Sequence, residues 1–264
     1  MSPAPSRQRP RLTQAERHAQ ILALLRRDGI VRIATLARTF GVTTETARRD
    51  LDELAVDGAI KRTYGGAAGR SLTDEPGIGI RGRARAEECG RIAAAAADLI
   101  EPGDALMIDC GSTTSLFANA LAVRNLHLTV LTNCLPVAMA LGTSANCRVI
   151  LCAGDYVMRE GGIYGPDALA FIRRFKANRA IIGAGGLAAD GVSDADSASC
   201  AIKRAMIERA ARTTLLLDSS KYDAAQFERV CGLADIDDLV CEAPPPKRLA
   251  AGLREAGVKV IVAA

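Results

Sequence analysis

The feature that most restricts the fold is a pair of short amphipathic helices joined by a single tight turn. Apolar residues recur at helical spacing over residues 33–40, and Gly41 follows at once as a C-terminal stop. Only Val42 separates this stop from Thr43, which is a good N-cap for the next helix. Two helices joined by so short a turn predict a helix-turn-helix.

The second helix of the pair has two distinct faces. Ala47, Leu51 and Leu54 are predicted to point inward, while the N-terminal outer face is polar and cationic. Such a helix can enter the major groove of DNA, where an arginine either reads guanine through two parallel hydrogen bonds or clamps a phosphate. The sequence leaves open which arginine does which. The residues predicted to contact DNA here are Thr43, Thr44, Glu45, Thr46, Arg48 and Arg49.

Two flanking segments complete a small α+β domain of the winged helix-turn-helix type. A first helix is predicted from the capping box of Thr13 and Glu16 to a stop at Gly29. On the other side, residues 59–66 predict a short β-hairpin, which would act as a wing against the DNA backbone. The alternative is that its cations are simply solvated charges. The predicted backbone contacts of the wing are Lys61, Arg62 and Tyr64.

Charge is distributed unevenly along the chain. Residues 1–70 carry 13 Lys/Arg and 7 Asp/Glu, a net charge of +6, and because the whole chain has +4, the remainder carries −2. A basic head on a mildly acidic body suits a polyanion as the partner of the head alone. The length of 264 residues favours two domains, and a hydrophobic fraction of 49% is enough for each to bury a core.

Beyond the wing, predicted helices and short apolar strands alternate. The strands are expected at residues 105–109, 128–132, 148–152, 180–182, 214–217, 239–241 and 258–262. Strands that are apolar throughout and separated by helices indicate a mainly parallel sheet covered on both faces, as in Rossmann-like α/β domains. We therefore predict a multidomain chain with a winged helix-turn-helix domain at residues 12–67, a linker at 68–83 and an α/β domain at 84–264.

The carboxyl ends of these strands are rich in polar residues, and ligands of parallel sheets bind at that edge. Residues 109–114 join a strand directly to a helix, so that Gly111 allows a close turn and the helix start offers free N–H groups that suit a phosphate. The alternative is that the hydroxyl residues of this segment simply cap the helix. The residues predicted around the ligand are Asp109, Gly111, Ser112, Thr113, Thr114, Thr132, Asn133, Gly154, Asp218 and Lys221. Lys221 would neutralise the phosphate, while Asp109 and Asp218 would accept sugar hydroxyls.

The head resembles the DNA-binding domain of the DeoR family of repressors over residues 16–67. The resemblance rests on Gly-Val-Thr at 41–43, Thr-Ala-Arg-Arg-Asp-Leu at 46–51 and Gly-Gly-Ala at 65–67, in this order and spacing. One departure is Tyr64, where the family usually has histidine, although a tyrosine can also donate to a phosphate. The family shares Asp50, which we expect to orient the neighbouring arginines.

The body is similar to the DeoR-family sensor domain over residues 76–264. This resemblance implies a fold like that of sugar-phosphate isomerases and adds Arg159, Gly165 and Lys203 to the effector pocket. It also implies a repressor of a carbohydrate catabolic operon, relieved by a phosphorylated sugar or related metabolite. Two departures, Glu-Cys-Gly-Arg at 88–91 in place of a Glu-Lys-Arg run and Ala201 in place of an acid, leave the effector's identity open.

Two enzymatic interpretations compete with a regulator. A sugar-phosphate isomerase-like enzyme with an appended DNA-binding head would use Asp109 or Asp194 as a base, but the Gly-rich phosphate loop followed by a lysine is not evident. A nicotinamide-binding protein would use residues 183–186, which lack the full G-x-G-x-x-G pattern. We therefore expect a regulator that is not an enzyme.

The remaining expectations concern partners and location. The 8 cysteines are scattered without a C-x-x-C pair and there are only 2 histidines, so we expect no metal and no cofactor. Neither a secretory signal nor a long apolar run occurs, which predicts a cytoplasmic protein without a membrane partner. Because one small head offers few phosphate contacts, we expect a homo-oligomer that binds a double-stranded DNA operator and a small phosphorylated metabolite.

Overall fold

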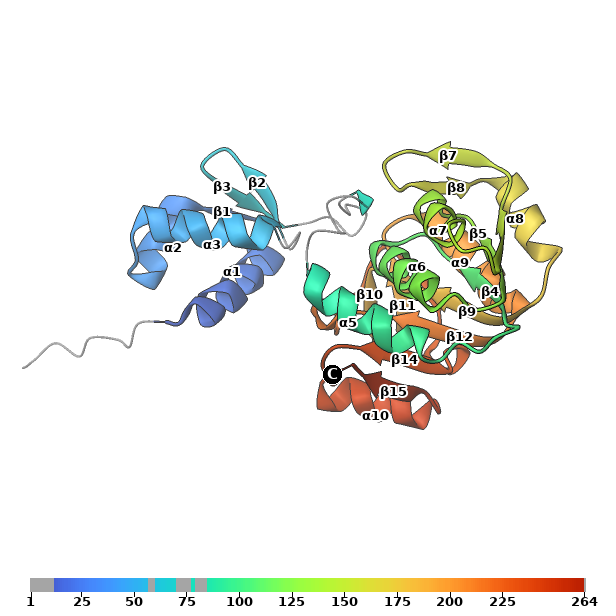
Figure 1. The fold of residues 1–264 in the computed structure, drawn as a ribbon. Helices are drawn as coiled ribbons and strands as arrows, with labels where there is room; N and C mark the ends of the chain where they lie inside the picture. The colour runs from blue at the N-terminus through green and yellow to red at the C-terminus, as the bar shows by residue number, and fades with distance from the viewer. Residues whose placement is uncertain (1–11, 57–59, 70–76, 79–84, 264) are drawn as a thin grey trace, which may run out of the picture. The chain divides into compact units, whose positions relative to one another are not determined.

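The computed structural model describes residues 12–56, 60–69, 77–78 and 85–263 (Figure 1). The chain divides into two units, the head at residues 1–71 and the body at residues 72–264. Most of the predicted linker at 68–83 lies outside the described residues, so the domain boundaries 12–67 and 84–264 stay predictions.

The head contains the three predicted helices and a small antiparallel sheet. Its elements are α1 (Gln14–Asp28), β1 (Ile30–Arg32), α2 (Ile33–Phe40), α3 (Thr44–Val56), β2 (Lys61–Thr63) and β3 (Gly66–Ala68), with sheet order β1-β3-β2. The capping box of Thr13 and Glu16 starts α1, and Gly41 ends α2 in the left-handed conformation that glycine favours. The wing is confirmed as the hairpin β2–β3, but the sequence did not predict β1, a strand too short to show a period.

One core holds the head together. Ile21 of α1, Leu36 of α2 and Leu51 of α3 are fully buried in the same cluster, as the helical spacing predicted. Asp50 is also buried, and here the expectation was wrong. It does not orient Arg48 or Arg49, since its two carboxylate oxygens accept hydrogen bonds of 2.7 and 2.8 Å from the guanidinium of Arg17 on α1. On a helix, Asp50 lies on the face of Ala47 and Leu54 rather than on the outer face.

The body is built on a seven-stranded sheet of order β15-β14-β12-β9-β4-β5-β6, in which every neighbouring pair is parallel. The strands are β4 (Ala105–Ile108), β5 (Leu128–Thr132), β6 (Cys147–Leu151), β9 (Ala177–Ile182), β12 (Ala210–Leu216), β14 (Asp238–Cys241) and β15 (Lys259–Val262). All seven correspond to strands predicted from the sequence. The order reverses between β4 and β9, which makes the gap between their carboxyl ends the topological switch point of the sheet.

Helices cover both faces of this sheet (Figure 1). One face packs against α5 (Ala86–Ala97), α6 (Ser112–Arg124) and α7 (Leu135–Leu141), and the other against α8 (Pro166–Arg173), α9 (Ser197–Arg209) and α10 (Lys247–Glu255). Successive strand residues alternate between the two cores: Leu106 and Ile108 face the first, and Met107 faces the second. Burial on both faces explains why these strands are apolar throughout.

The body also contains shorter antiparallel strands outside the main sheet. They are the hairpin β7 (Asp155–Val157) and β8 (Gly162–Tyr164) and the sheet of β10 (Gly186–Ala188), β11 (Gly191–Asp194) and β13 (Glu228–Cys231). The sequence did not predict these five strands, since each has three or four residues and too little apolar pattern. Within the described residues, no helix combines the length and apolar character needed to cross a membrane.

Replacing Arg17 by alanine is expected to destabilise the head by about 3 kcal/mol, because it leaves the carboxylate of Asp50 buried without its guanidinium. Hydrogen exchange of the head amides in the full chain measures this loss. Arg38→Ala removes an exposed arginine from α2 and serves as the control. Equal protection in wild type and Arg17→Ala would show that the ion pair contributes nothing.

Candidate functional site

The hydroxyl groups at the start of α3 shape the turn of the helix-turn-helix. The backbone N–H of Thr46 donates to Thr43 Oγ1 at 3.1 Å, so that Thr43 caps the helix as predicted. The two threonine hydroxyls also share a hydrogen bond of 2.9 Å. Thr44 and Glu45 are exposed on the same turn. The turn is therefore fixed by its own side chains.

Arg48 and Arg49 lie on the outer face of α3. Their side chains are 57% and 75% exposed, and both guanidinium groups lie near Glu45, at 3.5 and 3.6 Å from its carboxylate oxygens. Exposed ion pairs of this kind are worth little in free energy. The two arginines are therefore free to exchange Glu45 for a phosphate or a base edge at small cost, which fits the predicted recognition helix.

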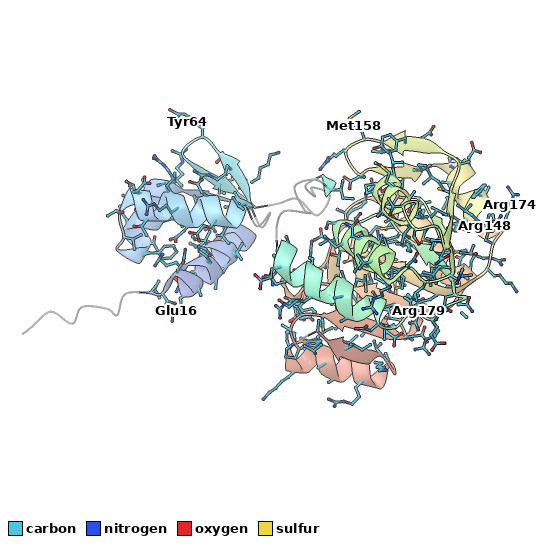
Figure 2. All side chains as sticks on the ribbon, viewed as in Figure 1. Glu16, Tyr64, Arg148, Met158, Arg174 and Arg179 are labelled. Carbon is cyan, nitrogen blue, oxygen red and sulfur yellow. The ribbon has the colours of Figure 1, made fainter. Side chains whose placement is uncertain are left out.

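The wing carries one fully exposed aromatic side chain and one anchored cation. Tyr64 projects from the tip of the β2–β3 hairpin and is wholly exposed (Figure 2). Arg62, which the sequence predicts on the DNA backbone, pairs with Asp52 of α3 at 2.9 Å and donates to the carbonyl of Gly66 at 2.7 Å. Arg62 thus fixes the wing to the recognition helix, while Lys61 and Tyr64 are exposed at its surface.

The predicted anion cradle lies at the switch point of the body. Asp109 directly follows β4 and Gly183 directly follows β9, and the N–H of Gly183 donates to Asp109 Oδ1 at 3.1 Å. Gly111 is the N-cap of α6, and no side chain caps this helix. The hydroxyl of Thr114 donates backward to the carbonyls of Asp109 and Gly111 instead. The described hydroxyl groups therefore do not cap α6, which leaves its first N–H groups without a side-chain acceptor.

Lys203 of α9 lies at the centre of a buried ionic cluster behind this cradle. Its Nζ is 2.8 Å from Asp109 Oδ2 and 3.0 Å from Asp194 Oδ2 at the end of β11. Lys203 Nζ also donates a hydrogen bond of 2.7 Å to the Ser199 hydroxyl. The two carboxylates are its ion-pair partners, and Asp109 Oδ2 is buried without a hydrogen bond from the described residues. Lys203 thus holds the residues behind the cradle together by its charge.

Burial and pairing act in opposite directions on the charges of this cluster. Burial raises the pKa of Asp109, against the attraction of Lys203. Burial also opposes the charged form of Lys203, but the carboxylates of Asp109 and Asp194 outweigh it and hold the lysine pKa well above its usual value. Lys203 is therefore charged throughout the physiological range.

Two polar side chains from β5 complete the cradle. Thr132 is fully buried and donates to the carbonyl of Ile108 at 2.7 Å, so it joins the ends of β4 and β5. Asn133 uses its side-chain N–H to reach the carbonyl of Ile163 at 3.1 Å. Its Oδ1 atom is buried and accepts no hydrogen bond from the described residues. Such an acceptor is uncommon in a folded protein and fits a site that a donor from outside would complete.

Arg85, which the sequence analysis did not single out, binds two carboxylates that follow strands of the same sheet. Arg85, at the N-cap of α5, pairs with Glu242 at 2.7 Å and with Asp218 at 3.3 Å. Glu242 follows β14 and also accepts from the backbone N–H of Ser219. Arg85 precedes a helix at the end of the predicted linker, and that position was the only sequence signal for it. Asp218 is thus paired with Arg85. Lys221 is half-buried in the adjacent turn 219–221.

Three predicted pocket residues belong to the β7–β8 hairpin region instead. A side chain at Gly154 would come within 2.5 Å of the Tyr164 carbonyl, so glycine is required there by packing. Gly165 is the N-cap of α8. Arg159 is 61% exposed in the turn between the two strands and lies near Glu160. The turn that carries Arg159 contacts the cradle, because the carbonyl of Glu160 lies 3.1 Å from the sulfur of Cys110.

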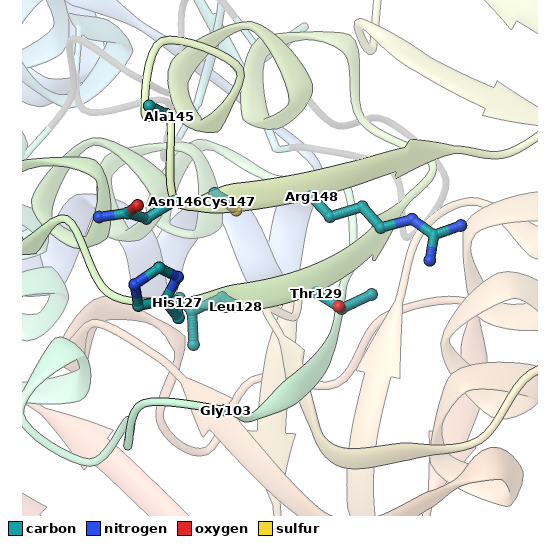
Figure 3. A pocket seen from close by; sticks show the side chains of 8 residues that line it. All are labelled: Gly103, His127, Leu128, Thr129, Ala145, Asn146, Cys147 and Arg148. Atoms are coloured by element: carbon teal, nitrogen blue, oxygen red, sulfur yellow. The ribbon is translucent and has the colours of Figure 1, made fainter.

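A pocket in the described part of the body lies at the opposite edge of the sheet (Figure 3). It is formed around the amino ends of β4, β5 and β6, and none of the predicted site residues lines it. Its lining residues are Gly103, His127, Leu128, Thr129, Ala145, Asn146, Cys147 and Arg148. Ligands of parallel sheets bind at the carboxyl ends, so we assign no role to this pocket.

A winged helix-turn-helix joined to a parallel-sheet domain with a polar switch point defines a transcriptional regulator of two domains. Residues 17–72 match the DeoR-like helix-turn-helix domain and residues 84–243 match the DeoR C terminal sensor domain. The chain belongs to the DeoR family of transcriptional repressors.

Named relatives agree with this membership. The glycerol-3-phosphate regulon repressor of Escherichia coli (strain K12) is 35% identical over 236 residues, which cover 89% of this chain and 93% of that protein. The transcriptional repressor CsqR of the same organism is 31% identical over 252 residues, covering 95% of this chain and 96% of that one.

Solved structures resemble the chain more distantly. Ribose 5-phosphate isomerase A from Methanocaldococcus jannaschii has a TM-score of 0.38 at 16% identity, covering 51% of this chain and 53% of that chain. A chain of the eIF2B-beta2-delta2 complex from C. thermophilum has a TM-score of 0.47 at 16% identity, covering 90% and 82%.

Replacing both Arg48 and Arg49 by alanine is expected to abolish specific binding to the operator without changing the fold, because both side chains are exposed and only weakly paired. Fluorescence anisotropy on the DNA upstream of the gene measures binding. Arg173→Ala is the matched control, since Arg173 is 58% exposed and also pairs weakly with a glutamate. A double variant that binds normally would refute the assignment of the recognition helix.

Replacing Lys203 by methionine is expected to destabilise the body by about 3 to 5 kcal/mol at neutral pH, because two carboxylates are then buried without their cation. The variant's folded carboxyls would have pKa values above those of the unfolded chain, so the folded state binds more protons and the loss shrinks as the pH falls. Denaturant unfolding at neutral and mildly acidic pH measures both effects. Lys247→Met, at an exposed position on α10, is the control.

Proposed function

We propose that this repressor senses a phosphorylated sugar or related metabolite at the carboxyl edge of the body sheet, and that binding relieves repression of a carbohydrate catabolic operon. The observation that carries the proposal is the uncapped N-terminus of α6 at the switch point, next to the unsatisfied Oδ1 of Asn133. A relative at 35% identity is named for the glycerol-3-phosphate regulon, and that compound is itself a phosphorylated metabolite.

Each group of the cradle has a distinct role in this proposal. The N–H groups at the start of α6 and the half-exposed Ser112 hold the phosphate, and Lys221 supplies the neutralising charge. Asn133 Oδ1 accepts a hydroxyl hydrogen from the rest of the ligand. Lys203, Asp109 and Thr132 position these groups, because all three are buried and hold the strand ends together by an ion pair and a hydrogen bond within the protein.

The ionic cluster favours a sensor over an isomerase-like enzyme. A general base has to reach the proton that it abstracts. Asp109 and Asp194, the two candidate bases, are at most 5% exposed, and each faces the Lys203 ammonium group. A carboxylate held in this way is a positioning group rather than a base, which supports regulation without turnover.

The route from the cradle to the linker runs through Arg85 in this proposal. Asp218 and Glu242, at the ends of two sheet strands, both hold Arg85, which has a left-handed backbone with φ of 54°. A ligand that draws Lys221 or Asp218 toward the cradle weakens the ion pair between Asp218 and Arg85, which lies at the end of the linker. A coupling of about 1 to 3 kcal/mol would lower the operator affinity roughly 5- to 150-fold.

We further propose that the protein acts as a homo-oligomer on double-stranded operator DNA. The head presents Arg48, Arg49, Lys61 and Tyr64 on its surface, and so few phosphate contacts bind weakly at physiological salt. Two heads on paired half-sites add their contacts within one assembly.

Replacing Ser112 by glutamate is expected to weaken binding of a phosphorylated sugar at least about tenfold, because the new carboxylate occupies the anion position. The fold should survive, since an acidic side chain in the first turn stabilises a helix. Isothermal titration with sugar phosphates, glycerol 3-phosphate and the matching unphosphorylated compounds measures affinity. Asn119→Glu, an exposed position on the same helix, is the control, and equal affinity in both variants would place the phosphate elsewhere.

A further inference from the structure

Two thiols lie in contact at the cradle, and nothing in the function above uses them. Cys110 follows β4 and Cys134 follows β5, two neighbouring strands of the sheet, each by one intervening residue. Their sulfur atoms are 3.0 Å apart. Among the hydrogen bonds of the described residues, this is the only one that joins two cysteines, although all eight lie in the described part of the chain.

The surroundings of the two thiols differ. Cys134 is fully buried, and its sulfur accepts from the Cys110 thiol and lies 3.8 Å from the Ser115 hydroxyl. Cys110 is 7% exposed, and the carbonyl of Glu160, 3.1 Å from its sulfur, is a second acceptor for the single Cys110 proton. Its hydrogen bond to Cys134 and burial raise the pKa of Cys110, while the same hydrogen bond lowers the pKa of Cys134. Cys134 is thus the thiol that ionises first and the better nucleophile.

We propose that Cys110 and Cys134 form a dithiol that a hydroperoxide oxidises reversibly to a disulfide across the floor of the cradle. The sulfur atoms need to approach each other by only about 1 Å to reach bonding distance. Because both thiols are buried, the oxidant has to be small and uncharged, as hydrogen peroxide is.

The reaction proceeds in two balanced steps. The Cys134 thiolate attacks one oxygen of hydrogen peroxide, the O–O bond breaks, and a sulfenic acid and water result once the leaving hydroxide takes up a proton. Cys110 sulfur then attacks the sulfenic sulfur, the S–O bond breaks, and the hydroxide that leaves takes the Cys110 proton to form a second water. In total, two thiols lose two protons and two electrons, and one peroxide is reduced to two waters.

The disulfide would act directly on the proposed phosphate site, a consequence that rests on the proposed function. Cys110 precedes Gly111, the N-cap of α6, and the Ser115 hydroxyl that faces Cys134 donates to the Gly111 carbonyl at 2.7 Å. Drawing Cys110 toward Cys134 therefore moves the carbonyl and the first N–H groups of the cradle. The oxidised protein is the form with the lower affinity for phosphate.

Peptide mapping of the full-length protein tests the dithiol itself. The reduced protein is treated with hydrogen peroxide, remaining thiols are alkylated, and the digest is analysed by mass spectrometry with and without dithiothreitol. The expected product is one peptide pair joined through Cys110 and Cys134 that dithiothreitol separates. Recovery of both cysteines as alkylated thiols, while other cysteines are oxidised, overturns the proposal. This result comes from the wild type and does not depend on a variant that folds.

Two variants separate a specific pair from general accessibility. Cys147 is the most exposed of the eight cysteines and stands apart from the cradle at the opposite edge of the sheet. Cys147→Ser is expected to form the cross-link as the wild type does, and Cys110→Ser to leave Cys134 as a dithiothreitol-reducible sulfenic acid without a cross-link. A link from Cys134 to another cysteine in Cys110→Ser would overturn the specific pairing.

Affinity for inorganic phosphate, measured by titration calorimetry before and after oxidation, tests the consequence for the cradle. Oxidation is expected to weaken binding at least about tenfold, and dithiothreitol to restore it. A mapped disulfide with unchanged phosphate affinity overturns the gating. Absence of phosphate binding in the reduced protein counts against the proposed function instead, while the peptide map still decides whether the dithiol exists.

Discussion

The ammonium group of Lys203 lies between the carboxylates of Asp109 and Asp194 and donates a hydrogen bond to Ser199. These contacts join α9, the end of β4 and the end of β11 at one buried point. Asp109 in turn accepts the N–H of Gly183, so the cluster also links β4 to β9 at the switch point. Everything proposed for the body depends on this arrangement, because Asp109 lies two residues before Gly111, the N-cap of α6, and so fixes where the first turn of that helix begins.

The head is also held together by ion pairs. A buried ion pair between Arg17 and Asp50 joins α1 to α3, and Arg62 joins the wing to α3 through Asp52. These charges pair with one another and so fix the shape of the head. The outer charges of Arg48 and Arg49 have only Glu45 nearby, at distances and exposures where pairing is weak. In both domains, buried charges therefore build the scaffold and exposed groups are left for the partner.

The sequence predicted the large elements because their signals are long and regular. The period of residues 33–40, the stop at Gly41 and the apolar strands of the parallel sheet were all confirmed. β1 and β10 lack the continuous apolar run that predicted β4 and β14, which are themselves only four residues long. Charge pairing was the other failure. Arg17, Asp52 and Asp109 pair with Asp50, Arg62 and Lys203 across 33, 10 and 94 residues of chain, and only the folded chain brings them together.

One molecule is proposed to carry both a DNA-reading head and a phosphate-responsive body. An anisotropy titration of the full-length protein on its own upstream DNA, with and without sugar phosphates and glycerol 3-phosphate, measures both properties at once. We expect specific binding that one phosphorylated compound weakens roughly 5- to 150-fold, while its unphosphorylated counterpart has no effect. Specific binding that no phosphorylated compound changes would contradict this prediction, and so would equal weakening by a phosphorylated compound and its unphosphorylated counterpart.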